Sequence, residues 1–150
     1  MSQSKLFIFI SLYIALVIYT LRPIHVVEPE LQGKINLIDN LINANCNNPE
    51  DLNRPFQTVY EFTDLPTNVI GLCNTLNHYY KIQIDKTYWA FATEREKFSL
   101  IAHEMTHCVL DMNEHSNDRD NYMYYALNPS LSIATITNQI IENTKKVCNE

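Results

Sequence analysis

Two histidines and a glutamate form the pattern in this chain that is best suited to chemistry. The stretch from Ser99 to Leu110 reads S-L-I-A-H-E-M-T-H-C-V-L and contains H-E-x-x-H at His103, Glu104 and His107. Side chains four residues apart on a helix lie on one face, so both imidazoles can reach a single ion. Glu104 projects close to that face, where it can take a proton from a metal-bound water. Two neutral nitrogen ligands, an open coordination position and a carboxylate base that is not a ligand are what zinc-dependent hydrolysis of peptides requires.

The competing interpretation of this pattern is structural. A histidine beside an apolar helix face is often a satisfied core or boundary residue. Here, however, three polar groups share an otherwise hydrophobic helix, and burying them without a common partner would be costly. The sequence therefore favours a metal site.

The residues before the pattern predict a well-defined helix start. Thr93 followed by Glu96 matches a capping box, and Glu94 adds negative charge at the positive end of the helix dipole. Apolar residues then recur at helical spacing, at Phe98, Ile101, Ala102, Met105, Val109 and Leu110.

A catalytic zinc usually takes a third protein ligand besides a water. His115, eight residues after His107, is our first choice, because the helix can end near Asn113 and the chain can then fold back. Asn is the usual non-glycine residue in the left-handed turn that this requires. The competing acidic residues are Asp111, Glu114, Asp118 and Asp120 in the following loop and Glu142 on the last predicted helix.

The other elements alternate between helix and strand patterns. Apolar residues at helical spacing predict an amphipathic helix over Pro29–Ala44, which packs on a sheet. Alternation predicts a strand over Phe56–Phe62, and Val69–Asp85 is consistent with a hairpin that turns at Asn74–His78.

Two further segments flank the pattern. Tyr88, Trp89 and Phe91 are expected to form an aromatic plug in the core. Asn128 is expected to cap a last helix with Pro129 at its first position. Its inner face is marked by Ile133, Ile136, Ile140, Thr144 and Val147.

Composition and length limit the function classes. The chain has 150 residues, enough for one buried core, and a net charge of −6 with no basic patch. A nucleic-acid-binding surface is therefore not expected.

The N-terminal stretch from Leu6 to Leu21 is apolar and uncharged over 16 residues, between Lys5 and Arg22. This length suits the hydrophobic core of a signal peptide or a signal anchor. No small-x-small cleavage site lies near Thr20, which favours an uncleaved anchor with the N-terminus inside. We therefore expect a signal peptide or membrane anchor over residues 1–22, one domain over residues 23–150, and a membrane-anchored or secreted protein.

The four cysteines are an even number behind an export signal, so up to two disulfides are expected. No C-x-x-C pair is present, which argues against a cysteine zinc site. Spacing alone does not choose among the three possible pairings. Because Cys73 ends a predicted strand that should pack near the helix carrying Cys108, we expect these two to pair, which leaves Cys46 and Cys148. The alternative is four buried free thiols.

The segment from Glu28 through Pro129 resembles the small metallopeptidases of phages and bacteria, which are distantly similar to metzincins. The matching pieces are Glu28–Leu31, Asp64–Pro66, Gly71–Cys73, Ile84–Trp89, Glu94–Glu96, His103–Leu110 and, as a methionine-containing turn, Tyr122–Tyr124 with Asn128 and Pro129. Two positions depart from metzincins. Leu110 stands where they carry glycine, and the third histidine follows the second by eight residues rather than six.

The resemblance implies an α+β fold in which a small mixed sheet packs on the H-E-x-x-H helix, with an N-terminal and a C-terminal helix. One strand would form the edge of the cleft and receive substrate in extended form. It also implies zinc ligands at His103, His107 and His115, with Glu104 as general base and Met123 beneath the metal.

We therefore expect a zinc-dependent metalloendopeptidase that acts on peptide or protein substrates. Zinc would polarise the scissile carbonyl, and Glu104 would deprotonate the zinc-bound water and then pass the proton to the leaving amine. The alternative is a non-catalytic membrane-anchored or secreted module with a structural or vestigial zinc site. A closed four-ligand site would favour the module, and three ligands with an open position would favour the enzyme.

Overall fold

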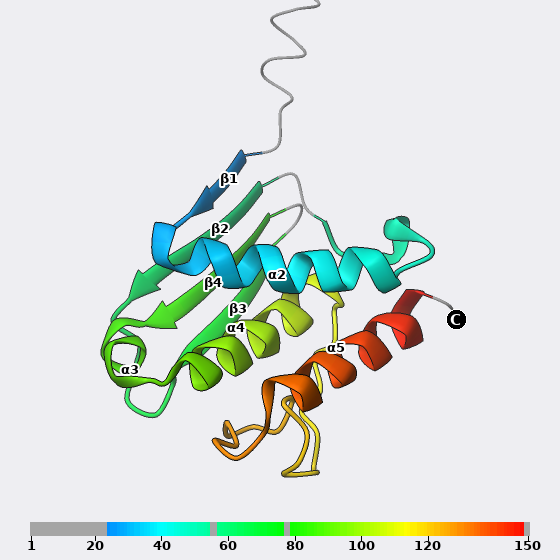
Figure 1. The fold of residues 1–150 in the computed structure, drawn as a ribbon. Coiled ribbons are helices and arrows are strands. Elements are labelled where there is room, and N and C mark those ends of the chain that lie inside the picture. Colours follow the sequence, from blue (N-terminus) through cyan, green and yellow to red (C-terminus); the bar gives the residue numbers. More distant parts are fainter. Residues whose placement is uncertain (1–23, 55–56, 77–78, 149–150) are drawn as a thin grey trace, which may run out of the picture.

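A mixed four-stranded sheet and the helices packed on it make up the protein in the computed structural model (Figure 1). The structure describes residues 24–54, 57–76 and 79–148. The expected α+β class, with a small mixed sheet on the H-E-x-x-H helix and a helix near each end, is confirmed for this part of the chain.

The sheet has the strand order β1-β2-β4-β3. Strands β1 (Ile24–Val27), β2 (Gln57–Thr63) and β4 (Tyr79–Asp85) run parallel, and β3 (Gly71–Leu76) is antiparallel to β4. Strand β3 forms an edge of the sheet.

Both sequence predictions for this sheet are recovered with small shifts. The strand expected over Phe56–Phe62 is β2, and Phe56 itself lies outside the described residues. The expected hairpin is confirmed as β3 and β4. Its turn is shorter than expected, because the residues from Asn74 to Leu76 pair with β4.

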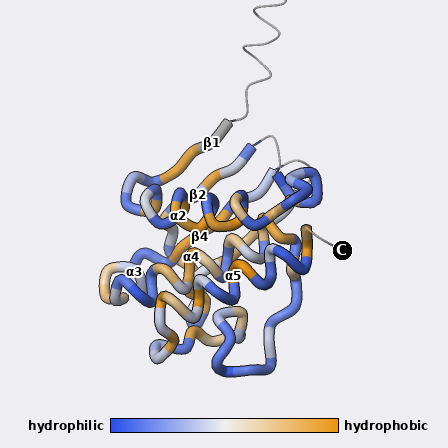
Figure 2. The backbone as a smooth tube through the Cα atoms, turned by 45° about the vertical axis from the view of Figure 1, so that its right-hand side comes forward, coloured by the Kyte–Doolittle hydropathy of each residue, from blue (hydrophilic) through white to orange (hydrophobic). Residues whose placement is uncertain are grey.

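Alternation along β4 decides which face of the sheet is covered. Tyr80, Ile82 and Ile84 are buried, and the residues between them are partly exposed. The buried side chains belong to the same core as the inner residues of the helices. In Figure 2 apolar stretches of the chain gather in the helices and central strands, with hydrophilic stretches around them.

Helix α4 (Glu94–Val109) packs against the sheet and against two other helices. It contacts β3 and β4 on the sheet and also α2 (Pro29–Asn45) and α5 (Ile133–Cys148). The expected helix over Pro29–Ala44 is confirmed as α2, whose buried face is Leu31, Ile35, Ile38 and Ile42. Because sheet and helices surround α4, nearly all of its residues from Phe98 onward are buried.

The last helix starts later than expected. The Asn128 side chain does not cap it but accepts a hydrogen bond from the Ser130 N–H within a separate turn (2.9 Å). Helix α5 begins at Ile133, where the Ser132 hydroxyl accepts from the Thr135 N–H (3.0 Å). Ile133 is 47% exposed, so its assignment to the inner face was wrong. The inner positions Ile136, Ile140 and Thr144 are buried as expected, and Val147 is partly buried.

The aromatic residues before α4 lie on the short helix α3 (Lys86–Phe91). Trp89 is buried and its ring centroid lies 5.3 Å from that of Phe62, as expected of a core residue. Phe91 is 87% exposed, so its place in the core plug was wrong. Positions two apart on a helix point in nearly opposite directions, which prevents both side chains from reaching the same core.

Two disulfides connect the elements. Cys73 on β3 is bonded to Cys108 near the end of α4, and Cys46 after α2 is bonded to Cys148 at the end of α5. The expected pairing is confirmed and the alternative of free thiols is wrong, since all four cysteines are bonded. Two such bonds are typical of a secreted or extracellular protein.

The apolar segment from Leu6 to Leu21 lies outside the described residues, and so does the boundary expected at residue 22. In the described ranges, none of the helices combines the length and the apolar character needed to cross a membrane.

Candidate metal centre

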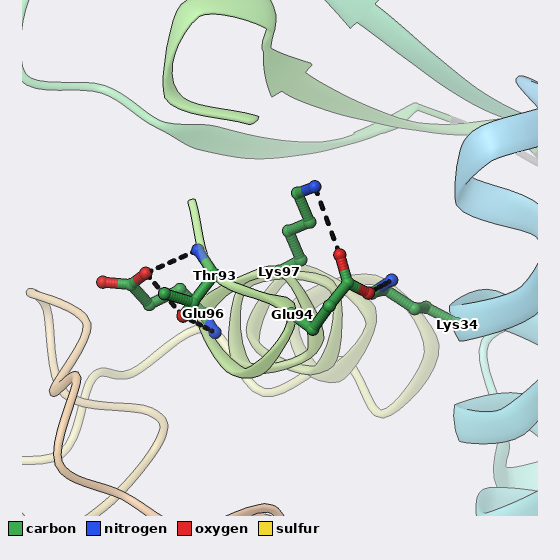
Figure 3. Close-up of polar contacts among 5 residues, drawn as sticks. All are labelled: Lys34, Thr93, Glu94, Glu96 and Lys97. Atoms are coloured by element: carbon green, nitrogen blue, oxygen red, sulfur yellow. Dashed lines mark hydrogen bonds and ion pairs between the residues drawn. The ribbon is translucent and has the colours of Figure 1, made fainter. Parts of the chain in front are cut away.

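The start of α4 is fixed by the capping box that the sequence predicted (Figure 3). The Thr93 hydroxyl oxygen accepts from the Glu96 N–H (3.3 Å), and the Glu96 carboxylate accepts from the Thr93 N–H (2.7 Å). Glu94 forms ion pairs with Lys34 on α2 (2.7 Å) and with Lys97 one turn further along (3.2 Å). These contacts fix where the helix begins and hence which of its residues face the sheet.

The histidines of the pattern meet His115 in one cluster. The Nε2 atoms of His103 and His107 are 3.0 Å apart, and the Nε2 of His115 lies 3.2 Å from the first and 3.3 Å from the second. Among the described residues, these three form the group of ligand-type side chains that is close enough to hold a metal ion.

The second ring nitrogens set the protonation of two of these histidines. The Nδ1 of His103 lies 2.9 Å from the carbonyl oxygen of Tyr122, and the Nδ1 of His107 lies 2.5 Å from that of Met112. Because a carbonyl only accepts, each Nδ1 carries the proton and each neutral ring keeps its Nε2 lone pair free. The Nε2 lone pairs of His103 and His107 therefore face and repel each other. A cation bound to both nitrogens would remove this repulsion.

The spacing of the three Nε2 atoms fits a transition metal. Zinc–nitrogen bonds of 2.0–2.1 Å at tetrahedral angles would place neighbouring nitrogens about 3.3–3.4 Å apart. The observed separations of 3.0–3.3 Å come close to this value. Backbone carbonyls that orient ligand imidazoles through Nδ1 are also usual at metal sites. The cluster and the chemistry of its donors therefore point to a bound metal.

Burial keeps these imidazoles in the ligand form. Burial lowers the pKa of His103 to about 4, despite the opposing hydrogen bond to Tyr122. Burial also lowers the pKa of His107. Both rings are thus neutral at physiological pH, as metal ligation requires.

His115 reaches the cluster because α4 stops sooner than expected. The helix ends at Val109, and the residue with left-handed backbone geometry is Asp111 (φ 52°) rather than Asn113. The chain reverses direction at Asp111, and this brings the Met112 carbonyl back to the Nδ1 of His107. The Ser116 N–H then donates to the Met123 carbonyl (2.9 Å), directly after His115 in the chain.

None of the competing acidic residues joins this cluster in the described part of the chain. Asp111, Glu114, Asp118 and Asp120 are exposed on the loop after α4, and one of the Asp118 carboxylate oxygens accepts from the Asp120 N–H (2.9 Å). Glu142 lies on α5 and is exposed. The structure thus brings together the three histidines and leaves these five carboxylates outside.

Glu104 is held at the sheet side of the site. The side chain is 5% exposed, and its carboxylate accepts a hydrogen bond from the backbone N–H of Cys73 on β3. Burial raises the pKa of Glu104 to about 8, and the bond from Cys73 opposes this shift. This pKa lies close to the pH range in which the group can take up and release a proton.

A cavity of about 420 Å³ opens over the three histidines and Glu104. Strand β3 forms one wall through Gly71, Leu72, Cys73 and Thr75. A second wall comes from Tyr124, Tyr125 and Leu127 in the loop before α5. The other lining residues are Asn68, Val69, Ile70, Leu100 and Asn113. Apart from the histidines, Glu104 and the two tyrosines, the described residues of this lining are all uncharged at every pH.

Some residues of the site were not predicted from the sequence. Tyr122 and Met112 act through backbone carbonyls, which leave no signal in a sequence. The Tyr122 hydroxyl also lies between the side chains of Thr106 (2.7 Å) and Asn143 (3.0 Å). Met123, expected beneath the metal, is buried in the same turn, and its role stays a prediction.

Comparison with known proteins supports the same class of site. The family model described as "Putative phage metallopeptidase" matches residues 45–131, which include β2, β3, β4, α4 and the loop that carries His115. No curated protein and no solved structure matches the chain.

Proposed function

The chain belongs to the phage metallopeptidase family, and we propose that it is a zinc-dependent metalloendopeptidase. The observation that carries the proposal is the cluster of three Nε2 atoms 3.0–3.3 Å apart beside a buried glutamate. Three ligands that open into a cavity suit a catalytic metal better than a closed structural one.

Each residue of the site has a proposed role. His103, His107 and His115 hold the metal through Nε2. Bound zinc would supply the Lewis acidity that activates a water and polarises the scissile carbonyl. Glu104 accepts the proton of the attacking water and delivers it to the leaving amine. Its place in the cavity lining, next to the histidines, supports this role.

The proposed substrate is an extended peptide laid along β3. This strand pairs with β4 on one side, and its residues Gly71, Leu72, Cys73 and Thr75 line the cavity. Peptides add to such an edge through main-chain hydrogen bonds. The apolar residues in the cavity lining favour neutral side chains next to the cleaved bond.

Metal binding tests the ligand set. The purified chain should hold close to one zinc, and His115→Ala should weaken zinc affinity by more than about 100-fold, since loss of a partner outside the coordination sphere already costs about 10–100-fold. Asp118→Ala and Asp120→Ala are the matched controls, because their exposed carboxylates contribute only a screened field. Normal zinc binding by His115→Ala, with loss in Glu142→Ala, would contradict the assignment.

Peptide cleavage tests the role of Glu104. Glu104→Gln should keep the zinc and lower kcat by about 10²–10⁴-fold, the contribution of a positioned general base. Cleavage of a quenched peptide library by the wild type and Glu104→Gln at equal zinc content gives the comparison. Equal rates would remove Glu104 from the mechanism.

The location of the enzyme is also a proposal. Two disulfides support folding in an oxidising compartment. We propose that residues 1–22 act as a signal peptide or membrane anchor and that residues 23–150 form the catalytic domain outside the cytoplasm. Sequencing the N-terminus of the mature protein distinguishes a cleaved signal from an anchor.

A further inference from the structure

Strand β3 and helix α4 contact each other at two successive points with matched spacing. Gly71 faces Glu104, and Cys73 is bonded to Cys108. Two residues along a strand span about 6.6–6.8 Å, and four residues along a helix span about 6 Å. The two contacts are therefore successive steps along one seam between the strand and the helix.

The first contact brings the strand backbone against the proposed general base. A Cβ added at Gly71 would lie 2.5 Å from the Glu104 Oε1 atom, so the carboxylate occupies the space next to this glycine. Two residues further, the Cys73 N–H donates to the same carboxylate. The position of Glu104 thus depends on where β3 lies.

The second contact is covalent and lies directly beside the metal cluster. Cys108 follows His107 in the chain and is fully buried, whereas Cys73 is partly buried at the cavity wall. Strand β3 is an edge strand whose ladder partner in the described sheet is β4. The disulfide is the covalent link that holds this edge strand onto α4.

We propose that Cys73 and Cys108 are positioning residues for catalysis. Their disulfide holds β3 against α4, so that the Cys73 N–H stays on the Glu104 carboxylate and the cleft keeps its width beside the metal. This inference rests on the proposed peptidase function. It adds that the disulfide between Cys73 and Cys108 holds Glu104 in position, in addition to any contribution to overall stability.

The second disulfide provides the matched control. Cys46–Cys148 joins residues 102 apart in sequence, whereas Cys73–Cys108 joins residues 35 apart. In the chain-entropy account, the bond that closes the longer loop stabilises the fold at least as much. Neither Cys46 nor Cys148 lines the cavity. A role in stability alone would therefore affect both double variants, and the control at least as strongly.

The test compares the full chain with Cys73→Ala/Cys108→Ala and Cys46→Ala/Cys148→Ala. Three assays are run below the lowest Tm of the three proteins. They give kcat and KM for a quenched peptide, the affinity and visible spectrum of bound Co²⁺, and the hydrogen exchange rate of the residue 73 amide. We expect the first variant to lose at least about tenfold in kcat, to bind Co²⁺ and to exchange this amide at least about tenfold faster. The control variant should keep the kcat and this exchange rate of the wild type.

Equal effects in both variants, or an unchanged exchange rate at residue 73, would overturn the proposal. If the wild type cleaves no peptide, the proposed function fails, and the exchange rate still decides whether the bond positions β3. If the alanine pair does not fold, Cys73→Ala/Cys108→Val restores buried volume without the bond and takes its place in the same comparison.

Discussion

Replacing Gly71 by alanine probes the closest approach between the sheet and the site. The added Cβ would lie 2.5 Å from the Glu104 Oε1 atom and 2.8 Å from the Leu100 Cδ1 atom. Gly71 does not have a positive φ, so the backbone geometry itself accepts alanine. The cost of the substitution therefore comes from these contacts, and Glu104 or β3 has to move.

The expected magnitude follows from two opposing effects. Overpacking a buried site costs about 1–3 kcal/mol. Replacing glycine by alanine also lowers the conformational entropy of the unfolded chain, which stabilises the folded protein by about 0.4–1 kcal/mol. A net loss of about 1–2 kcal/mol in the free energy of unfolding should remain. Displacement of the Glu104 carboxylate should also lower kcat/KM, with zinc binding retained because the histidines are not touched.

Gly33→Ala is the control for this experiment, because Gly33 is the second of the two glycines in the chain. A Cβ there meets nothing within 4 Å, and the residue lies inside α2. It should raise the free energy of unfolding by about 0.4–1 kcal/mol and leave cleavage unchanged. Urea titrations and initial rates measure both variants. Wild-type stability and kcat/KM in Gly71→Ala would refute the inference that the carboxylate is pressed against the strand.

Three further substitutions test other parts of the structure. Thr93→Ala removes the capping box of α4 and should lower the free energy of unfolding by about 1 kcal/mol in urea titrations. Tyr122→Phe leaves Thr106 without its buried partner and should cost about 1–2 kcal/mol in the same assay, with zinc affinity retained because the Tyr122 carbonyl remains. Hydrogen bonds from the backbone N–H groups of Tyr88 and then Leu65 lower the pKa of Asp85, so its contribution to stability is present above the unfolded pKa and is lost as the pH falls through the folded pKa. Asp85→Asn should therefore weaken the pH dependence of the urea midpoint in acid, and an unchanged acid limb would contradict this reasoning.

The elements with a strong local signal were predictable from the sequence. The capping box at Thr93 and the regular apolar spacing of α2 depend on contacts within a few residues. The pairing of Cys73 with Cys108 also followed, because it required only that one strand pack beside one helix. The structure also brings His115 together with the two histidines of α4.

The structure differs from the sequence predictions where more than one residue could adopt the required local conformation. Asn113 and Asp111 both tolerate left-handed geometry, and the return of the Met112 carbonyl to His107 selects Asp111. Asn128 and Ser132 both suit a helix start, and α5 begins after Ser132. Such choices depend on tertiary contacts that a linear pattern does not contain.

The sequence did not identify Glu104 as the group that contacts Gly71. This contact joins two elements that are far apart in the chain, and its geometry depends on how closely the sheet approaches the helix. A lone glycine in a strand pattern indicates close approach of some kind. It does not say which group approaches.

The bond between Cys46 and Cys148 affects what happens to the protein when a protease cuts it. The acidic loop after α4 lies between Cys108 and Cys148 in the chain. A single cut there would produce two fragments that remain joined through Cys46. The nicked molecule would migrate as one species until it is reduced, and His115 would stay tethered to the other histidines on either side of the cut. Integrity of this protein therefore has to be judged from gels run both with and without reductant.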